Sequence, residues 1–282
     1  MAFFAAVMLI TAFVLHPAVT FISFAAAFAY SVFLKGRKAL RFALLFVLPV
    51  MVFVAVLNPL FNHAGTTVLF SLKNGNPVTL EAVLYGIVSA GMFAALIMWF
   101  SCLNTVMTSD KYVYLFGRII PALSLVFSMA LRFVPRFTRR IAEVSEAQRS
   151  VSGDIGRDPI KGVSHGLAVV SMTTTWALES AVGISDSMKS RGYGLPGRTS
   201  YSIFRFDRRD AFVLSALFIC FGVSVAAMAT KHVCFRFYPS IKYTSAGLFG
   251  VAGCAAFALL CLLPMLLNIE ESIKWRAIRS RI

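Results

Sequence analysis

The chain has 282 residues, of which 59% are hydrophobic and only 14% are charged. Soluble domains average about 45–50% apolar and about 25% charged residues, so this composition excludes a soluble single-domain protein and indicates an integral membrane protein. The net charge of +15 does not indicate a nucleic-acid partner. The basic residues lie in loops beside apolar segments, and no soluble domain is available to carry a nucleic-acid-binding patch.

The N-terminal part of the chain predicts four membrane spans. Its first apolar tract, residues 2–34, is interrupted by His16-Pro17. Because proline ends or kinks a helix, we expect a hairpin of two short spans there rather than one long helix. The four expected spans are, in chain order, residues 2–15, 18–34, 40–61 and 80–105.

The rest of the chain predicts two more spans, at 211–230 and 244–267, separated from the first four by a basic segment. Residues 132–210 of that segment hold 13 Lys or Arg and 8 Asp or Glu. The apolar stretch 116–131 is too short for a full crossing, so we expect a re-entrant or interfacial helix that leads into the segment.

Charge predicts the topology and the division of the chain. Basic residues gather at 35–41, 132–210 and 270–282, which the positive-inside rule places in the cytoplasm. We therefore expect an all-α, polytopic protein of the prokaryotic plasma membrane with about six transmembrane helices and a cytoplasmic helical segment. The expected divisions are 1–131, 132–210 and 211–282.

The cytoplasmic segment contains two helical patterns, at 136–151 and from about 163 to 190. The second carries a stripe with a spacing of about 3.5 residues that is rich in small side chains, which allow close helix packing. We expect this stripe to pack against another helix. Its members are Val163, Leu167, Val170, Thr174, Ala177, Ala181, Ile184 and Met188.

Both helices end in a basic residue, small residues and a glycine. The first end contains Arg149, Ser152 and Gly153, and the second is Ser190-Arg191-Gly192. Such ends serve as ordinary helix caps, because cations complement the helix dipole and glycine adopts the left-handed cap conformation. An arginine at a helix tip also binds carboxylates or backbone carbonyls of a docking partner. The residues themselves leave both interpretations open.

No catalytic or metal-binding pattern stands out in the sequence. The five cysteines form no Cys-x-x-Cys pair, and the four histidines are scattered. The spans carry Glu81 at an edge but essentially no buried carboxylate, lysine or histidine, and no phosphate-binding glycine loop is present. We expect a non-catalytic protein without metal or cofactor.

A family resemblance rests on three motifs. The runs Ala130–Pro135, Glu146–Arg149 and Asp186–Tyr193 resemble the transmembrane T component of energy-coupling factor (ECF) transporters, the EcfT/CbiQ family. The resemblance implies two crossed coupling helices that bind two ABC ATPase subunits. It also implies contact with one membrane-embedded, substrate-binding S component, for uptake of a vitamin or transition-metal ion.

The chain departs from the family pattern at the first helix end. The resemblance implies alanine-arginine-glycine there, whereas this chain has Val151-Ser152-Gly153, so Arg149 is the candidate replacement. The permease of a conventional ABC transporter and a standalone secondary transporter remain as alternatives. Neither fits as well, because the spans show few polar groups and no internal repeat.

Overall fold

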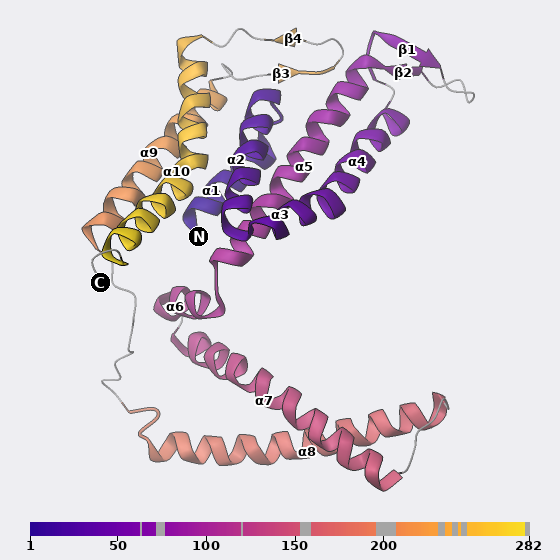
Figure 1. The fold of residues 1–282 in the computed structure, drawn as a ribbon, viewed down its shortest axis with the longest axis vertical. Helices are drawn as coiled ribbons and strands as arrows, with labels where there is room; N and C mark the ends of the chain where they lie inside the picture. The colour runs from indigo at the N-terminus through magenta and orange to yellow at the C-terminus, as the bar shows by residue number, and fades with distance from the viewer. Residues whose placement is uncertain are drawn as a thin grey trace. The chain divides into compact units, whose positions relative to one another are not determined.

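The computed structural model describes two compact units, which are Met1–Met107 with Phe206–Ile282 and Thr108–Arg205. Within them, the described residues are 1–62, 64–71, 77–119, 121–152, 159–195, 207–230, 235–238, 242–243 and 247–279. These residues are all-α apart from two short hairpins, which confirms the predicted fold class (Figure 1).

The first unit is a helical bundle with both hairpins at one end (Figure 1). Its helices are α1 (Ala2–Phe13), α2 (Pro17–Lys35), α3 (Arg37–Phe42), the π-helix η1 (Ala43–Val47), α4 (Leu48–Phe61), α5 (Leu80–Val106), α9 (Arg208–Ala229) and α10 (Leu248–Arg279). The antiparallel hairpins are β1 (Val68–Ser71) with β2 (Pro77–Thr79), and β3 (Phe235–Arg236) with β4 (Lys242–Tyr243).

Six helices of the described residues are long and apolar enough to cross a bilayer, judged by length and composition. Five of them coincide with predicted spans, so the chain is a multi-pass membrane protein. The sixth is α8 (Pro159–Ser190), which we expected to lie in the cytoplasm. Conversely, α1 has only 12 residues, about 18 Å of helix, which is short for a hydrocarbon core of about 30 Å.

Helix α5 organises the bundle through a face of small residues. An added Cβ at Gly91 lies 3.1 Å from Thr20 of α2, and one at Gly86 lies 2.9 Å from the Ala55 carbonyl of α4. Small side chains let helix backbones approach closely in a bilayer, where burial of apolar surface gives no driving force. Glycine and alanine on α5 therefore set how closely α2 and α4 pack.

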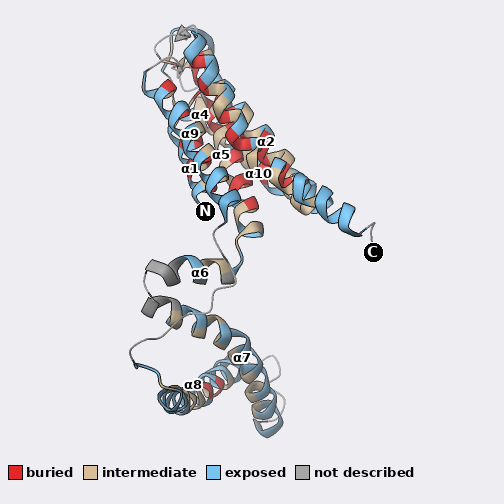
Figure 2. Ribbon diagram, turned by 90° about the vertical axis from the view of Figure 1, so that its left-hand side faces the viewer, coloured by how far each residue is buried: buried red, intermediate tan, exposed pale blue. Residues whose placement is uncertain are grey.

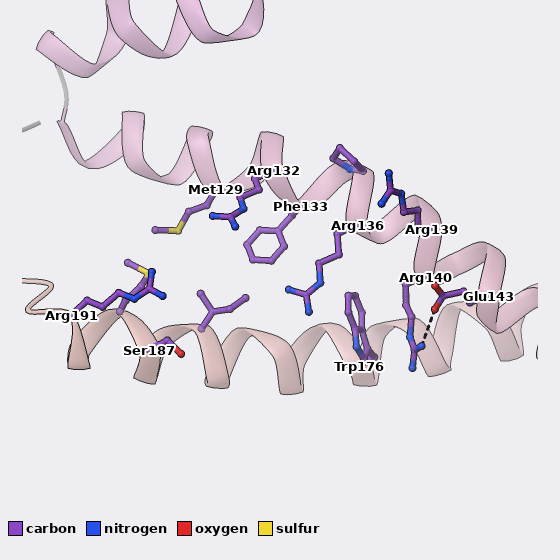
Figure 3. Close-up of a pocket in the computed structure, with 13 residues that line it drawn as sticks. Met129, Arg132, Phe133, Arg136, Arg139, Arg140, Glu143, Trp176, Ser187 and Arg191 are labelled. Atoms are coloured by element: carbon purple, nitrogen blue, oxygen red, sulfur yellow. Dashed lines mark hydrogen bonds and ion pairs between the residues drawn. The ribbon is translucent and has the colours of Figure 1, made fainter. Parts of the chain in front are cut away.

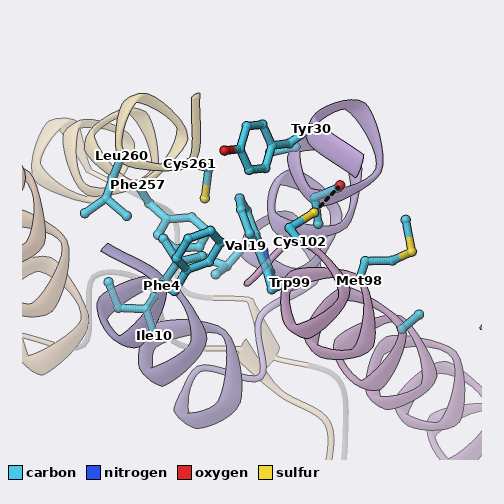
Figure 4. Packing of buried hydrophobic residues seen from close by; sticks show 14 of the residues in the cluster. Phe4, Ile10, Val19, Tyr30, Met98, Trp99, Cys102, Phe257, Leu260 and Cys261 are labelled. Carbon is cyan, nitrogen blue, oxygen red and sulfur yellow. Dashed lines mark hydrogen bonds between the residues drawn. The ribbon is translucent and has the colours of Figure 1, made fainter. Parts of the chain in front are cut away.

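Large buried side chains complete the core of the bundle (Figure 4), together with a short series of polar contacts. Trp99 of α5 is fully buried. Its indole N–H donates to Ser23 Oγ of α2 at 3.0 Å, and Ser23 Oγ lies 2.8 Å from Thr11 Oγ1 of α1. Because a polar group buried without a partner is costly, these contacts fix the register of three helices. Phe257 and Leu260 of α10 pack against the same core.

One end of the bundle carries the hairpins and a buried carboxylate. Glu81, in the first turn of α5, accepts hydrogen bonds from the backbone and side chains of Thr66 and Thr67. These bonds hold the loop that precedes β1 against the start of α5. Beside it, Tyr85 makes ring contacts with Phe237 and Tyr238.

Most of the basic residues that the structure describes in this unit lie at the opposite end of the bundle, although the β3–β4 hairpin carries two of them. Lys35, the last residue of α2, donates to Ser101 Oγ near the end of α5 at 2.6 Å. Arg209 at the start of α9 lies 3.3 Å from Glu271 near the end of α10. This clustering agrees with the topology that charge predicts, because an excess of basic residues marks the cytoplasmic side.

The second unit consists of α6 (Ser109–Ile119), α7 (Pro121–Ser152) and α8. The boundary that we expected between residues 131 and 132 falls inside α7, so the apolar stretch 121–131 and the basic stretch after it form one helix. Pro121 begins this helix, at a position where its missing N–H costs nothing. Much of the surface of α7 and α8 is exposed (Figure 2).

The packing of α9 against α10 gives a stability prediction. An added Cβ at Gly253 of α10 lies only 2.3 Å from Ala227 Cβ of α9. We expect Gly253→Ala to destabilise the protein by about 1–3 kcal/mol through overpacking, seen as a lower Tm in detergent. Gly222→Ala is the matched control, because a Cβ at Gly222 meets nothing within 4 Å. Equal Tm values for the two variants would contradict the close crossing.

Candidate functional site: the crossed helices α7 and α8

Helices α7 and α8 cross in antiparallel fashion. Ser145 Oγ lies 3.1 Å from His165 Nε2, and the rings of Phe137 and Trp176 meet edge to face at 5.5 Å between centroids. Residue numbers therefore fall along α7 as they rise along α8. The C-terminal ends of the two helices consequently point in opposite directions from the crossing.

Trp176 is the centre of this crossing. The guanidinium groups of Arg136 and Arg140 lie 5.4 and 5.5 Å from its ring centroid, within the range of cation–π attraction. Arg140 also forms a 3.0 Å ion pair with Glu143. One aromatic side chain of α8 thus contacts two successive turns of α7. On α8 itself, the buried residue Thr173 lies one turn before it.

The predicted stripe on α8 does not follow the contact with α7. Val163, Leu167 and Val170 are 64%, 67% and 63% exposed, whereas Ala177 is half-buried beside α7. The reason is geometric, because a repeat of 3.5 residues drifts by about 20° per heptad around a straight helix of 3.6 residues per turn. Only the second half of the stripe therefore approaches α7. Within that half, Thr174 and Ala181 are still exposed.

The C-terminal end of α8 is a Schellman cap. Tyr193 N donates to Met188 O at 3.0 Å, and Gly192 N donates to Lys189 O at 3.0 Å. Gly192 has φ 79°, in the left-handed region that favours glycine. Gly192 therefore caps α8. Arg191 sits at the cap position with an exposed side chain, and Ser190 Oγ donates to Ser187 O at 2.9 Å.

The end of α7 is partly described. Arg149 lies exposed in the last turn, and Val151 is 83% exposed. The backbone of Ser152 ends the helix, but its side chain and all of Gly153 lie outside the described residues. From Phe137 to Arg149 is about 18 Å along α7, and from Trp176 to Arg191 is about 22 Å along α8. The two basic ends are thus well separated.

An open cleft lies between the first half of α7 and the second half of α8. It has a volume of about 900 Å³. Figure 3 shows Arg132 and Arg136 of α7 and Arg191 of α8 with their side chains in the space between the helices. A second opening of about 450 Å³, lined mainly by apolar side chains, shares part of the same lining.

The sequence did not single out Arg132, Arg136 and Trp176 as residues that line a cleft. The one pattern that could have indicated the two arginines is their spacing of four residues, which places them on one face of a helix. The facing position of Trp176 depends on the crossing of the helices, which no local pattern indicates. In the part of the chain that the structure describes, no three metal-ligating side chains come together. The cleft offers guanidinium groups and apolar surface.

The role of Trp176 is testable by truncation. We expect Trp176→Ala to weaken the crossing by about 2 kcal/mol, roughly half the cost for a fully buried aromatic, because it removes the Phe137 and arginine contacts together. Backbone hydrogen exchange around residues 165–176 should then be about 30-fold faster. Trp275→Ala, which truncates a 68% exposed tryptophan on α10, serves as the control. Unchanged exchange in Trp176→Ala would show that other contacts hold the pair.

Comparison with known proteins identifies two relatives, while no protein-family model matches the chain. A segment of 115 residues, 40% of this chain, is 30% identical to the energy-coupling factor transporter transmembrane protein EcfT of Lactobacillus helveticus and covers 42% of that relative. A segment of 197 residues, 68% of this chain, is 27% identical to the protein of the same name from Lacticaseibacillus paracasei and covers 74% of it.

Proposed function

Because the chain belongs to the EcfT family of energy-coupling factor transporter transmembrane proteins, we propose that it couples ATP hydrolysis by two ATPase subunits to substrate uptake. In this proposal the chain is a non-catalytic scaffold. A separate membrane-embedded S component binds the substrate, which is a vitamin or a transition-metal ion. The observation that carries the proposal is the crossed pair α7–α8, whose two basic ends point in opposite directions.

The ends of the crossed pair are suited to two partner molecules. Arg191 and Arg149 are both exposed and lie on opposite sides of the crossing. A guanidinium group at such a position forms charge-assisted bonds with carboxylates or carbonyls of a groove on the partner. We assign Ser190, Arg191 and Gly192 to one ATPase. Arg149, Ser152 and Gly153 are assigned to the other.

The two ends are not equivalent in this proposal. Arg191 stands on a rigid Schellman cap, whereas Arg149 lies three residues before the end of its helix. A side chain held on a fixed backbone loses less conformational entropy when it binds. Arg191 is therefore the principal anchor, and Arg149 makes the weaker contact.

Charge reversal tests the ATPase contact. We expect Arg191→Glu to abolish uptake and Arg191→Ala to weaken co-purification of the ATPases by about 10- to 100-fold, the loss of one charge-assisted hydrogen bond. Arg149→Ala should have a smaller effect, and Arg279→Ala on the last turn of α10 is the control. Membrane insertion should be unchanged in all four. Normal uptake by Arg191→Glu refutes the assignment, and equal loss with Arg149→Ala makes the two ends equivalent.

The exposed half of the α8 stripe is assigned to the S component. Val163, Leu167 and Val170 form an apolar face that α7 does not cover. Large exposed apolar faces mark sites of protein or membrane contact. The second half of the stripe begins at the exposed Thr174, and its Ala177 and Ala181 reach the lining of the cleft. A partner on this face is sensitive to motion of α8 when ATP is hydrolysed.

A charge placed on this face tests the S-component contact. We expect Leu167→Glu to reduce co-purification of the S component at least 10-fold while the ATPases remain bound, because a buried unpaired carboxylate is costly. Thr175→Glu is the control, since Thr175 is exposed on α8 but lies off the stripe. If both variants retain the S component, the stripe is not its binding surface. Failure of the wild-type protein to co-purify with any ATPase would favour a standalone transporter.

A further inference from the structure

The cleft between α7 and α8 has one cationic side and one apolar side. The larger opening is lined by arginines of α7, including Arg132 and Arg136. The other opening is lined by Phe137, Ala177 and Ala181. Both openings share Met129, Phe133, Trp176, Ile184 and Met188, so they are two sides of one space. A ligand that filled this space would have to be charged at one end and apolar at the other.

The positive charge in the cleft is largely uncompensated. Glu143 is the acidic side chain in its lining, and it is already paired with Arg140. Ion pairs within the described residues do not reach Arg132 or Arg136. Like charges in a partly desolvated cleft repel one another, and they raise the local concentration of anions. An anionic group between these two arginines would relieve the repulsion.

The apolar side of the cleft indicates that its ligand is not a small soluble anion. Its volume of about 450 Å³ is within the range of about 300–1,000 Å³ typical of small-molecule sites. Along α7, the exposed apolar residues Val126 and Phe127 precede Arg132. This order, apolar then cationic, matches the change of polarity between acyl chains and headgroups at a bilayer surface. The surroundings of a multi-pass membrane protein supply amphiphiles of this kind.

We propose that the cleft binds one anionic phospholipid. Its phosphate lies between Arg132 and Arg136, where guanidinium groups form bidentate hydrogen bonds with phosphate oxygens. Its acyl chains lie over Phe133 and against Ala181 on the apolar side. The lipid fills the wedge between the helices and so fixes the angle at which they cross. Arg191 also lines the cleft, but the phosphate position that we propose is formed by Arg132 and Arg136.

Lipid binding is measured on the full chain, purified and delipidated in a neutral detergent. We expect added phosphatidylglycerol, but not phosphatidylcholine, to raise the Tm and to remain bound in native mass spectra. The double variant Arg132→Gln/Arg136→Gln should weaken this binding at least 10-fold. The control Lys161→Gln/Arg279→Gln removes the same charge at exposed positions outside the cleft and should bind as the wild type.

Two further experiments distinguish the possible ligands. Glycerol 3-phosphate at the same concentration should leave the Tm unchanged, and a Tm shift equal to that with phosphatidylglycerol would show that the ligand is a soluble anion rather than a lipid. Ala181→Phe fills the apolar side without changing charge, so it should weaken phosphatidylglycerol binding even if the arginine variant fails to fold. Unchanged lipid binding in Ala181→Phe, or equal binding of the two lipids by the wild type, overturns the proposal. Because these assays contain no ATPase and no uptake step, they are independent of the transport function.

Discussion

Helices inside a bilayer gain little from burying apolar surface against one another, since lipid tails are equally apolar. The bundle therefore depends on close approach and on polar groups that are paired internally. Gly91 and Gly253 permit the first, and the indole N–H of Trp99 provides the second through Ser23. The same constraint explains why α5, which carries small residues along much of its length, contacts several other helices.

The helix pair α7–α8 is stabilised in a different way from the bundle. It is held chiefly around Trp176, and much of the apolar surface of both helices is exposed. A pair with a limited contact area can change its crossing angle at low cost, whereas a fully packed core resists such motion. This arrangement suits a part that transmits movement. It also leaves surface for the partners proposed for its tips, its apolar face and its cleft.

Local signals in the sequence predicted much of the fold. Runs of about 20 apolar residues located five helices that are long enough to span, and the positions of Lys35 and Arg209 agree with the predicted orientation. The Ser190-Arg191-Gly192 sequence predicted the end of α8, because a glycine cap is a local property of the backbone. The break between α1 and α2 at His16-Pro17 followed from the geometry of proline, although α1 is shorter than the span that we expected.

Contacts between distant residues were decided only by the tertiary structure. The stripe from Val163 to Met188 was visible in the sequence, but which half of it meets α7 depends on helical drift and on the crossing angle. The cleft of Arg132, Arg136 and Trp176 likewise exists only because two helices cross at one point. Periodicity and capping thus determined the helices, while their pairing required side chains far apart in the chain to meet. Sequence alone established a membrane protein with a capped basic helix end, and the tertiary structure gave that end its position relative to the cleft.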